Sequence, residues 1–180
     1  MRAYYYLDDG SDKKLTHVDE SRPKVTLEQL NELGVFAETF DISSDQEVAK
    51  KLDEISTKRG YVSRDNVVIG KDIEGIEDKL DIFFTEHLHV DEEIRFINEG
   101  SGYFDVRDKN DEWIRISVSK NDFLIIPAGI FHRFTITPEM YVKATRLFKA
   151  NPSWVPVNRV DGGQHLDIPE RKEYVDAYLS

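Results

Sequence analysis

The stretch Glu86–Arg95, "EHLHVDEEIR", places two histidines one residue apart, followed by three consecutive acids and an arginine, in a chain with only five histidines. Alternate side chains of an extended segment face the same side. Four polar residues share one such face: His87, His89, Glu93 and Arg95. Glu92 and Ile94 fall on the opposite face. The stretch therefore predicts a strand that aims imidazoles and one carboxylate at a common point.

Imidazole nitrogens and a carboxylate oxygen form a ligand set that iron, nickel, manganese or zinc accepts. The segment "PAGIFH" (127–132) offers a further ligand, because its proline and glycine form a tight turn and His132 opens the next predicted strand. Asp91 has the same parity as Glu93, but we expect a turn near it and do not assign it as a ligand. The predicted metal ligands are thus His87, His89, Glu93 and His132.

A lone His-x-His pair is more often an ordinary surface or core feature than a metal site. The second motif and the scarcity of histidine elsewhere favour the metal site here. His17 and His165 have no other candidate ligand near them in the sequence, so we expect exposed or capping side chains at both positions. The chain has no cysteine, so any metal must be held by nitrogen and oxygen.

From Glu93 onward the chain reads as short strands broken by turn signals, which indicates an all-β barrel or sandwich. The expected strands cover 93–100, 102–108, 112–119, 123–129, 132–137 and 141–148. A short aromatic strand is expected at 3–7, and helices at 26–34, 44–60 and 76–83. The helices would then flank one end of the barrel.

The 180 residues lie within the range of a single domain. Within it we expect a mixed α/β flanking region over 1–82, a barrel core over 83–149 and a C-terminal extension over 150–180. The composition is 39% hydrophobic and 33% charged, which is typical of a globular protein.

The formal net charge of -11 opposes binding to a phosphate backbone, so we expect no nucleic-acid partner. No apolar run is long enough to span a bilayer, and we expect no membrane association. The opening "MRAYYYLDDG" lacks the pattern of a secretory signal, so a cytoplasmic location is expected.

The segment "HLHVDEEIRFINEG" (87–100) resembles the first motif of the cupin superfamily, His-x-His-x-x-x-Glu followed after six residues by glycine, and "PAGIFH" resembles the core of the second. The glycines that usually precede the two motifs are Asp81 and Asn121 here, and the asparagine often found after the last histidine is Ile136. Those glycines serve turn geometry, so the departures concern loop shape.

A closer resemblance covers nearly the whole chain. "RAYYYLDD", "TLEQLNELGV", "EEIRFINEGSGYFDVRD", "PAGIFHRFT", "ATRLF" and the later Trp154, Asn158 and Arg159 are similar to the acireductone dioxygenase family. The resemblance implies a mainly β cupin fold, a double-stranded β-helix (jelly-roll) barrel, with flanking α-helices mostly in the N-terminal part. It also implies one Fe(2+) or Ni(2+) per monomer, held by the four residues named above.

The family's role in methionine salvage implies the substrates acireductone, 1,2-dihydroxy-3-keto-5-(methylthio)pentene, and O2. It implies formate and 2-keto-4-methylthiobutyrate from the iron form, and formate, carbon monoxide and 3-methylthiopropionate from the nickel form. A monomer is expected, in the cytoplasm with the nucleus as a second location. The alternatives are another metal-dependent cupin enzyme, an isomerase or oxygenase, or a non-catalytic cupin binding module.

Arg95 lies on the same strand face as Glu93, so we expect it to point inward, where it would orient the substrate and stabilise its negative charge. The alternative is that Arg95 pairs with a local acid at the surface. Arg146 has the same two interpretations, and the resemblance favours the substrate. Phe83, Phe134 and Trp154 are expected to line a pocket for the methylthio tail, or to be ordinary barrel core. Three further arginines are expected to be solvated: Arg107, Arg115 and Arg133.

Overall fold

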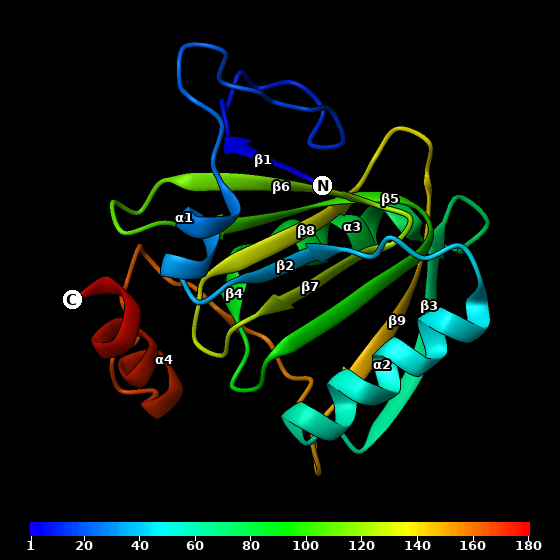
Figure 1. Ribbon diagram of the computed structural model, residues 1–180. Coiled ribbons are helices and arrows are strands. Elements are labelled where there is room, and N and C mark those ends of the chain that lie inside the picture. Colours follow the sequence, from blue (N-terminus) through cyan, green and yellow to red (C-terminus); the bar gives the residue numbers. More distant parts are fainter.

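The computed structural model describes residues 1–180 and is mainly antiparallel β-structure (Figure 1). Its strands are β1 (Arg2–Tyr5), β2 (Phe36–Thr39), β3 (Ser63–Gly70), β4 (His87–Leu88), β5 (Glu93–Arg107), β6 (Trp113–Ser119), β7 (Asp122–Ile126), β8 (His132–Ile136), β9 (Tyr141–Phe148) and β10 (Val157–Asn158). Its helices are α1 (Leu27–Glu32), α2 (Asp45–Arg59), α3 (Ile76–Phe84) and α4 (Pro169–Tyr174), and a π-helical turn covers Val175–Leu179.

Two antiparallel sheets share the long strand β5. The first sheet has the order β1-β6-β5-β8-β4-β10, and the second joins β2, β7, β5, β9 and β3. The N-terminal part of β5 pairs with β7 and β9, whereas its C-terminal part pairs with β6 and β8. The shared strand closes the two sheets into a barrel around one core, which confirms the predicted double-stranded β-helix.

The turn expected between residues 100 and 102 is absent, since β5 runs without a break across this point. Gly100 has φ +71, and a Cβ there would overlap the carbonyl oxygen of Tyr141. Only glycine fits a strand that bends so close to its neighbour, which is why the "EGSG" signal marks a bend here. A register shift between Ile97 and Glu99 accompanies the bend.

The register shift changes which residues of β5 face the interior. Before it, Arg95 and Ile97 line the central cavity, while Phe96 packs in a separate cluster beneath α2. After it, Phe104 lines the cavity instead. A single alternation along β5 therefore predicts the inward face correctly only up to the bulge.

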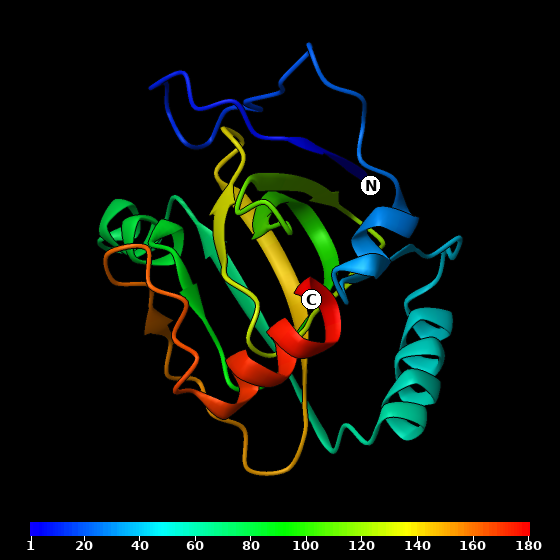
Figure 2. The same ribbon diagram turned by 90° about the vertical axis from the view of Figure 1, so that its left-hand side faces the viewer.

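The predicted helices at 26–34, 44–60 and 76–83 are confirmed within a few residues. Thr26 and Gln29 form a reciprocal capping box at the start of α1, and Ser44 accepts a hydrogen bond from the Glu47 N–H at the start of α2. Gly60 ends α2 in the left-handed region. Helix α2 lies across the outer face of the second sheet and buries Leu52 against it (Figures 1 and 2).

The prediction that Arg115 is solvated is wrong, and of the two alternatives for His17 the exposed one is wrong, because its ring is buried against the carbonyls of Leu7 and Asp12. The loop between β1 and α1 covers the outer face of the first sheet, and Arg115 donates hydrogen bonds to the carbonyls of Lys13 and Leu15 in that loop. The His17 side chain is buried in the same layer and stacks on Tyr6. Short-range patterns did not reveal this layer, because the loop and the sheet are about 100 residues apart in the chain.

Arg133 and Arg107 also have partners, so the prediction that they are solvated is wrong as well. Arg133 shares Asp105 with Arg115, and its guanidinium lies 3.9 Å from the centre of the Phe84 ring. Arg107 binds the Glu86 carboxylate through two hydrogen bonds of 2.9 Å. His165 is half-buried and accepts a hydrogen bond from the Val160 N–H, as expected of a capping side chain. No helix is long and apolar enough to cross a bilayer.

Candidate metal centre

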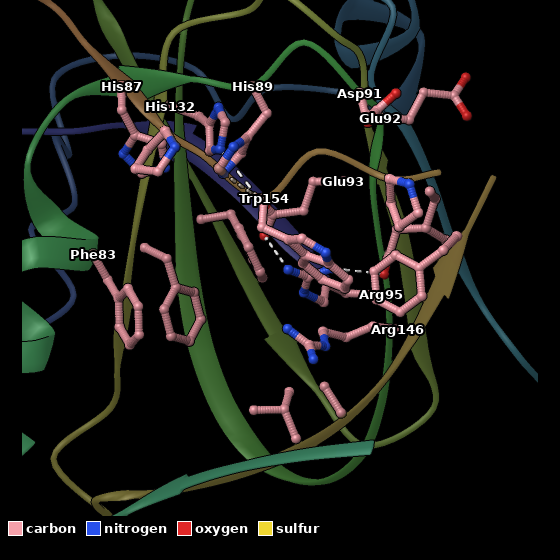
Figure 3. Close-up of a pocket in the computed structure, with 18 of the residues that line it drawn as sticks. Phe83, His87, His89, Asp91, Glu92, Glu93, Arg95, His132, Arg146 and Trp154 are labelled. Atoms are coloured by element: carbon pink, nitrogen blue, oxygen red, sulfur yellow. Dashed lines mark hydrogen bonds and ion pairs between the residues drawn. The ribbon is translucent and has the colours of Figure 1, made fainter. Parts of the chain in front are cut away.

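Three imidazoles from different parts of the chain meet at one end of the barrel (Figure 3). His87 on β4 and His132 on β8 are direct cross-strand partners, and His89 follows β4 in the connection to β5. Their ring centroids are 4.5 to 5.3 Å apart, and their candidate ligand atoms all lie within 4.8 Å of one another. The sheet pairing thus brings together residues that are more than forty positions apart in sequence.

Glu93, the first residue of β5, completes this group. Its Oε2 lies 3.2 Å from Nε2 of His132 and 3.6 Å from Nε2 of His89. Neighbouring acids point elsewhere: the Glu92 carboxylate accepts a hydrogen bond from the Tyr61 hydroxyl, and that of Asp91 accepts one from the Ser153 N–H. Figure 3 shows both side chains directed away from the imidazoles. Glu93 is the acid whose carboxylate joins the histidines.

Two of the imidazoles have a fixed tautomer. His87 donates its Nδ1–H to the carbonyl of Thr85 at 2.6 Å, and His132 donates its Nδ1–H to the carbonyl of Ile130 at 3.0 Å. Both rings therefore keep an unprotonated Nε2 for a ligand. Burial and the neighbouring His132 lower the pKa of His87 to about 4, so its ring is neutral near pH 7.

The carboxylate of Glu93 is ionised in this setting. Burial by itself would raise the pKa of Glu93, but the Arg95 guanidinium and the neighbouring His132 outweigh it and hold that pKa well below its usual range. Nη2 of Arg95 lies 3.1 Å from Oε1 of Glu93. A neutral His87 ring beside an ionised Glu93 carboxylate has the protonation states that metal binding requires.

These residues fit a divalent transition metal. Three nitrogens and one oxygen converge, and the rings of His87 and His132 are anchored through their Nδ1 atoms. Such a set suits Fe, Ni, Mn or Zn, and four protein ligands in an octahedral arrangement leave two positions for other groups. The arrangement could therefore hold one metal ion that also contacts a small molecule.

A cavity of about 410 Å³ extends from the imidazoles into the barrel. Arg95 and Arg146 both line it, from directly paired positions on β5 and β9. Arg146 also makes two hydrogen bonds to Asp65 on β3, of 2.8 and 2.6 Å. Arg146 was expected either to face the substrate or to pair with an acid, and in the structure it both lines the cavity and pairs with Asp65.

The three predicted pocket aromatics line the same cavity but form two groups. Phe83 on α3 meets Phe134 edge-on, with the ring centroids 6.4 Å apart. Trp154 lies at the mouth, where it packs on Phe148 at 4.2 Å and beside the Arg146 guanidinium at 4.6 Å. Its side of the cavity is partly open, since Trp154 is 47% exposed.

Strand β3 was missed from the sequence, and it supplies Asp65 together with the cavity-lining Val67 and Ile69. The β-branched run Val67–Ile69 before Gly70 was the signal that could have revealed it. Val142 and Ala144 of β9 also line the apolar part of the cavity, and sequence patterns did not single them out.

The fold and the site together define a cupin barrel whose three histidines and one glutamate face an internal cavity. The model of the ARD/ARD' family matches residues 2–156. A relative named acireductone dioxygenase from Heterostelium pallidum is 47% identical over 159 residues, which cover 88% of this chain and 98% of the relative. Another of that name from Neurospora crassa is 43% identical over 183 residues, covering 99% and 96%. The chain belongs to the ARD/ARD' family, that of the acireductone dioxygenases.

A solved structure shares the fold. It is described as acireductone dioxygenase from Bacillus anthracis with a cadmium ion in its active centre. The two structures superpose with a TM-score of 0.70 at 23% identity, covering 87% of this chain and 96% of that one.

Proposed function

We propose that this protein is a metal-dependent dioxygenase of methionine salvage that cleaves acireductone with O2. The family membership supports the activity, and the convergence of three imidazoles and Glu93 on the mouth of one internal cavity is the observation that carries it. The iron form would give formate and 2-keto-4-methylthiobutyrate, and the nickel form formate, carbon monoxide and 3-methylthiopropionate.

His87, His89, Glu93 and His132 would hold one Fe(2+) or Ni(2+) ion. Such an ion supplies Lewis acidity that lowers the pKa of a bound enediol and a template that fixes which carbon atoms meet dioxygen. The chain contributes a neutral His87 imidazole and a Glu93 carboxylate that needs no deprotonation near pH 7. The cadmium in the Bacillus anthracis protein supports a divalent ion, and does not distinguish iron from nickel.

Arg95 and Arg146 would bind the substrate's negative charge. Their guanidiniums line the cavity, where Arg95 lies against Glu93 and is the less exposed of the two. Arginine donates from a rigid planar fork, so the pair can orient the oxygens of an enediolate as well as neutralise it. Phe83 and Phe134 would take the methylthio tail in the apolar part of the cavity, and Trp154 would cover the mouth.

The purified protein tests this proposal directly. Bound metal is measured by elemental analysis, and iron- and nickel-loaded samples then receive acireductone and O2 while the substrate's ultraviolet absorbance is followed. Loss of absorbance well above the rate without enzyme is expected. A fully loaded protein that leaves acireductone at the uncatalysed rate would exclude the dioxygenase and favour another cupin activity or a binding module.

The monomeric state, the absence of a nucleic-acid partner and the cytoplasmic and nuclear locations stay predictions. Sedimentation of the purified protein measures the first, and fractionation of cells measures the last.

A further inference from the structure

The C-terminal segment Val157–Tyr174, which we call the C-terminal clamp, lies beyond the residues that the family model matches. It begins with β10, passes through a loop and ends with α4. In Figure 2 this segment, orange to red, runs across the near side of the barrel. It contacts the elements that carry the histidines from outside the cavity, as the following hydrogen bonds show.

The first contact is a strand pairing. Asn158 of β10 is the register partner of His87 on β4, and the N–H of Arg159 donates to the carbonyl of Glu86 at 2.9 Å. Strand β4 has only two residues, so pairing on both sides, with β8 and with β10, is what holds it in the sheet. The backbone of His87 is therefore fixed in part by the clamp.

An ion cluster locks this pairing. The Arg159 guanidinium donates to Oε1 of Glu86 at 2.8 Å and to both carboxylate oxygens of Asp111 at 2.7 and 2.9 Å. Arg107 binds the same Glu86 through two further hydrogen bonds. The Arg159 and Glu86 side chains are only 4% and 21% exposed, which makes the charge-assisted bond between them stronger than a surface pair would be. Glu86 directly precedes His87, so the cluster fixes the residue next to a proposed ligand.

The second contact reaches the other two histidines. Arg171 of α4, which is 3% exposed, donates to the carbonyl of Gly129 at 3.0 Å. The N–H of Gly129 in turn donates to the carbonyl of His89 at 2.9 Å. Gly129 has φ +81, and a Cβ there would overlap the carbonyl of Glu170, so the turn and α4 touch directly. The same turn holds the ring of His132 through Ile130.

Phe131 connects the two contacts. It is fully buried, directly precedes His132, and has the Arg159 and Arg171 guanidiniums over its ring at 4.6 and 4.3 Å from the centroid. Both arginines thus contact the residue before His132. Arg159 also contacts the residue before His87, and Arg171 contacts Gly129, which binds the carbonyl of His89. Cation–π contacts of buried guanidiniums add to the hydrogen bonds described above.

We infer that the C-terminal clamp sets the affinity of the metal centre, with Arg159 and Arg171 as positioning residues for the three imidazoles. This inference rests on the proposed ligand set. Groups outside a ligand shell that fix its orientation change metal affinity by about 10- to 100-fold when they are removed. Neither arginine lines the cavity, so both act through their contacts with Glu86, Gly129 and Phe131.

The test compares metal affinity with thermal stability in the full-length protein. Arg159→Lys and Arg171→Lys keep the charge but cannot bridge the same oxygens, and Arg159→Met and Arg171→Met remove it. Tyr174→Phe is the matched control, because it removes a buried hydrogen bond from the same helix to the Leu33 carbonyl without touching the turn at Gly129. Nickel dissociation constants come from chelator competition, and the visible spectrum of the cobalt-loaded protein reports ligand geometry.

Weaker nickel binding by about 10-fold or more, with a changed cobalt spectrum, is expected for the arginine variants. Tyr174→Phe should lower the unfolding temperature and leave both metal readouts unchanged. The inference is overturned if the arginine variants that fold bind nickel like the wild type, or if Tyr174→Phe weakens binding as much as they do. None of these measurements involves acireductone, so a protein that lacks the proposed activity could still confirm or overturn the role of the clamp.

Discussion

Arg95 and Arg146 lie directly opposite each other on β5 and β9, and both line the cavity that the three imidazoles face. Like charges in such a pair repel each other, so the arrangement needs balancing anions. Glu93 lies against Arg95 and Asp65 against Arg146, one at each end of the row. Burial and the like charge of Arg146 lower the pKa of Arg95, and together they outweigh the opposite effect of the Glu93 carboxylate. Each guanidinium is thus held by one carboxylate while it lines the cavity.

Replacing Arg95 with alanine should lower kcat/KM for acireductone by about 10²- to 10³-fold, as loss of one preorganised donor to a developing negative charge does. Metal content should stay near that of the wild type, since the four ligands remain. Elemental analysis and steady-state kinetics measure the two effects. Arg64→Ala, which removes an exposed pair with Asp53, is the control. Unchanged kinetics in the Arg95 variant would return this residue to a structural role.

Asp65→Asn tests whether Arg146 must be held in place. The Asp65 carboxylate accepts two hydrogen bonds from Arg146, whereas the amide can accept only one at the same position. We expect kcat/KM to fall about tenfold through misplacement of the guanidinium, with metal binding and folding unchanged. Equal activity of Asp65→Asn and the wild type would show that Arg146 needs no anchor.

The ligand assignment predicts that His89→Ala and Glu93→Ala each weaken metal binding by more than about 100-fold, beyond the effect of changing an outer partner. Glu92→Gln should bind metal like the wild type, because the Glu92 carboxylate turns to Tyr61. Metal occupancy after dialysis against a weak chelator distinguishes these outcomes. Full occupancy in either of the first two variants would mean that other atoms hold the ion.

Tyr4 should make the protein sensitive to alkali. Its hydroxyl is buried without a hydrogen-bond partner, and burial, with a smaller contribution from Tyr103, raises its pKa to about 12. Between pH 10 and 12 the unfolded chain loses this proton and the folded chain keeps it, so stability falls as pH rises, by up to ~3 kcal/mol. Tyr4→Phe should be nearly neutral at pH 7 and flatten this decline. Urea unfolding at several pH values measures it, and an equal decline in both proteins would contradict the assignment.

Sequence patterns predicted those parts of the fold that depend on near neighbours. The caps at Thr26 and Ser44 and the glycine stop at Gly60 follow local chemistry, and all three appear in the structure. The inward face shared by Glu93 and Arg95 follows from strand alternation, which holds as far as the bulge after Ile97.

Features that depend on distant partners could not be predicted in this way. The burial of Arg115 requires the loop carrying Lys13 and Leu15, and the pairing of Arg146 requires β3 with Asp65. Neither partner is near in sequence, and an arginine in a strand has the same local pattern whether it faces water or a buried acid. The clustering of the three histidines could be predicted from the sequence because two spaced motifs, and not one, indicated a common site.

Turnover of the iron-loaded protein under 18O2, with products analysed by mass spectrometry, tests the central claim most directly. Dioxygenase cleavage of the bond between the two enediol carbons places one oxygen atom of O2 in formate and the other in the carboxyl group of 2-keto-4-methylthiobutyrate. We predict one 18O in each product from the wild type and no labelled product above background from Glu93→Ala. If the wild type consumes acireductone but either product lacks 18O, the proposed function is contradicted. If Glu93→Ala labels both products as the wild type does, the proposed site is contradicted.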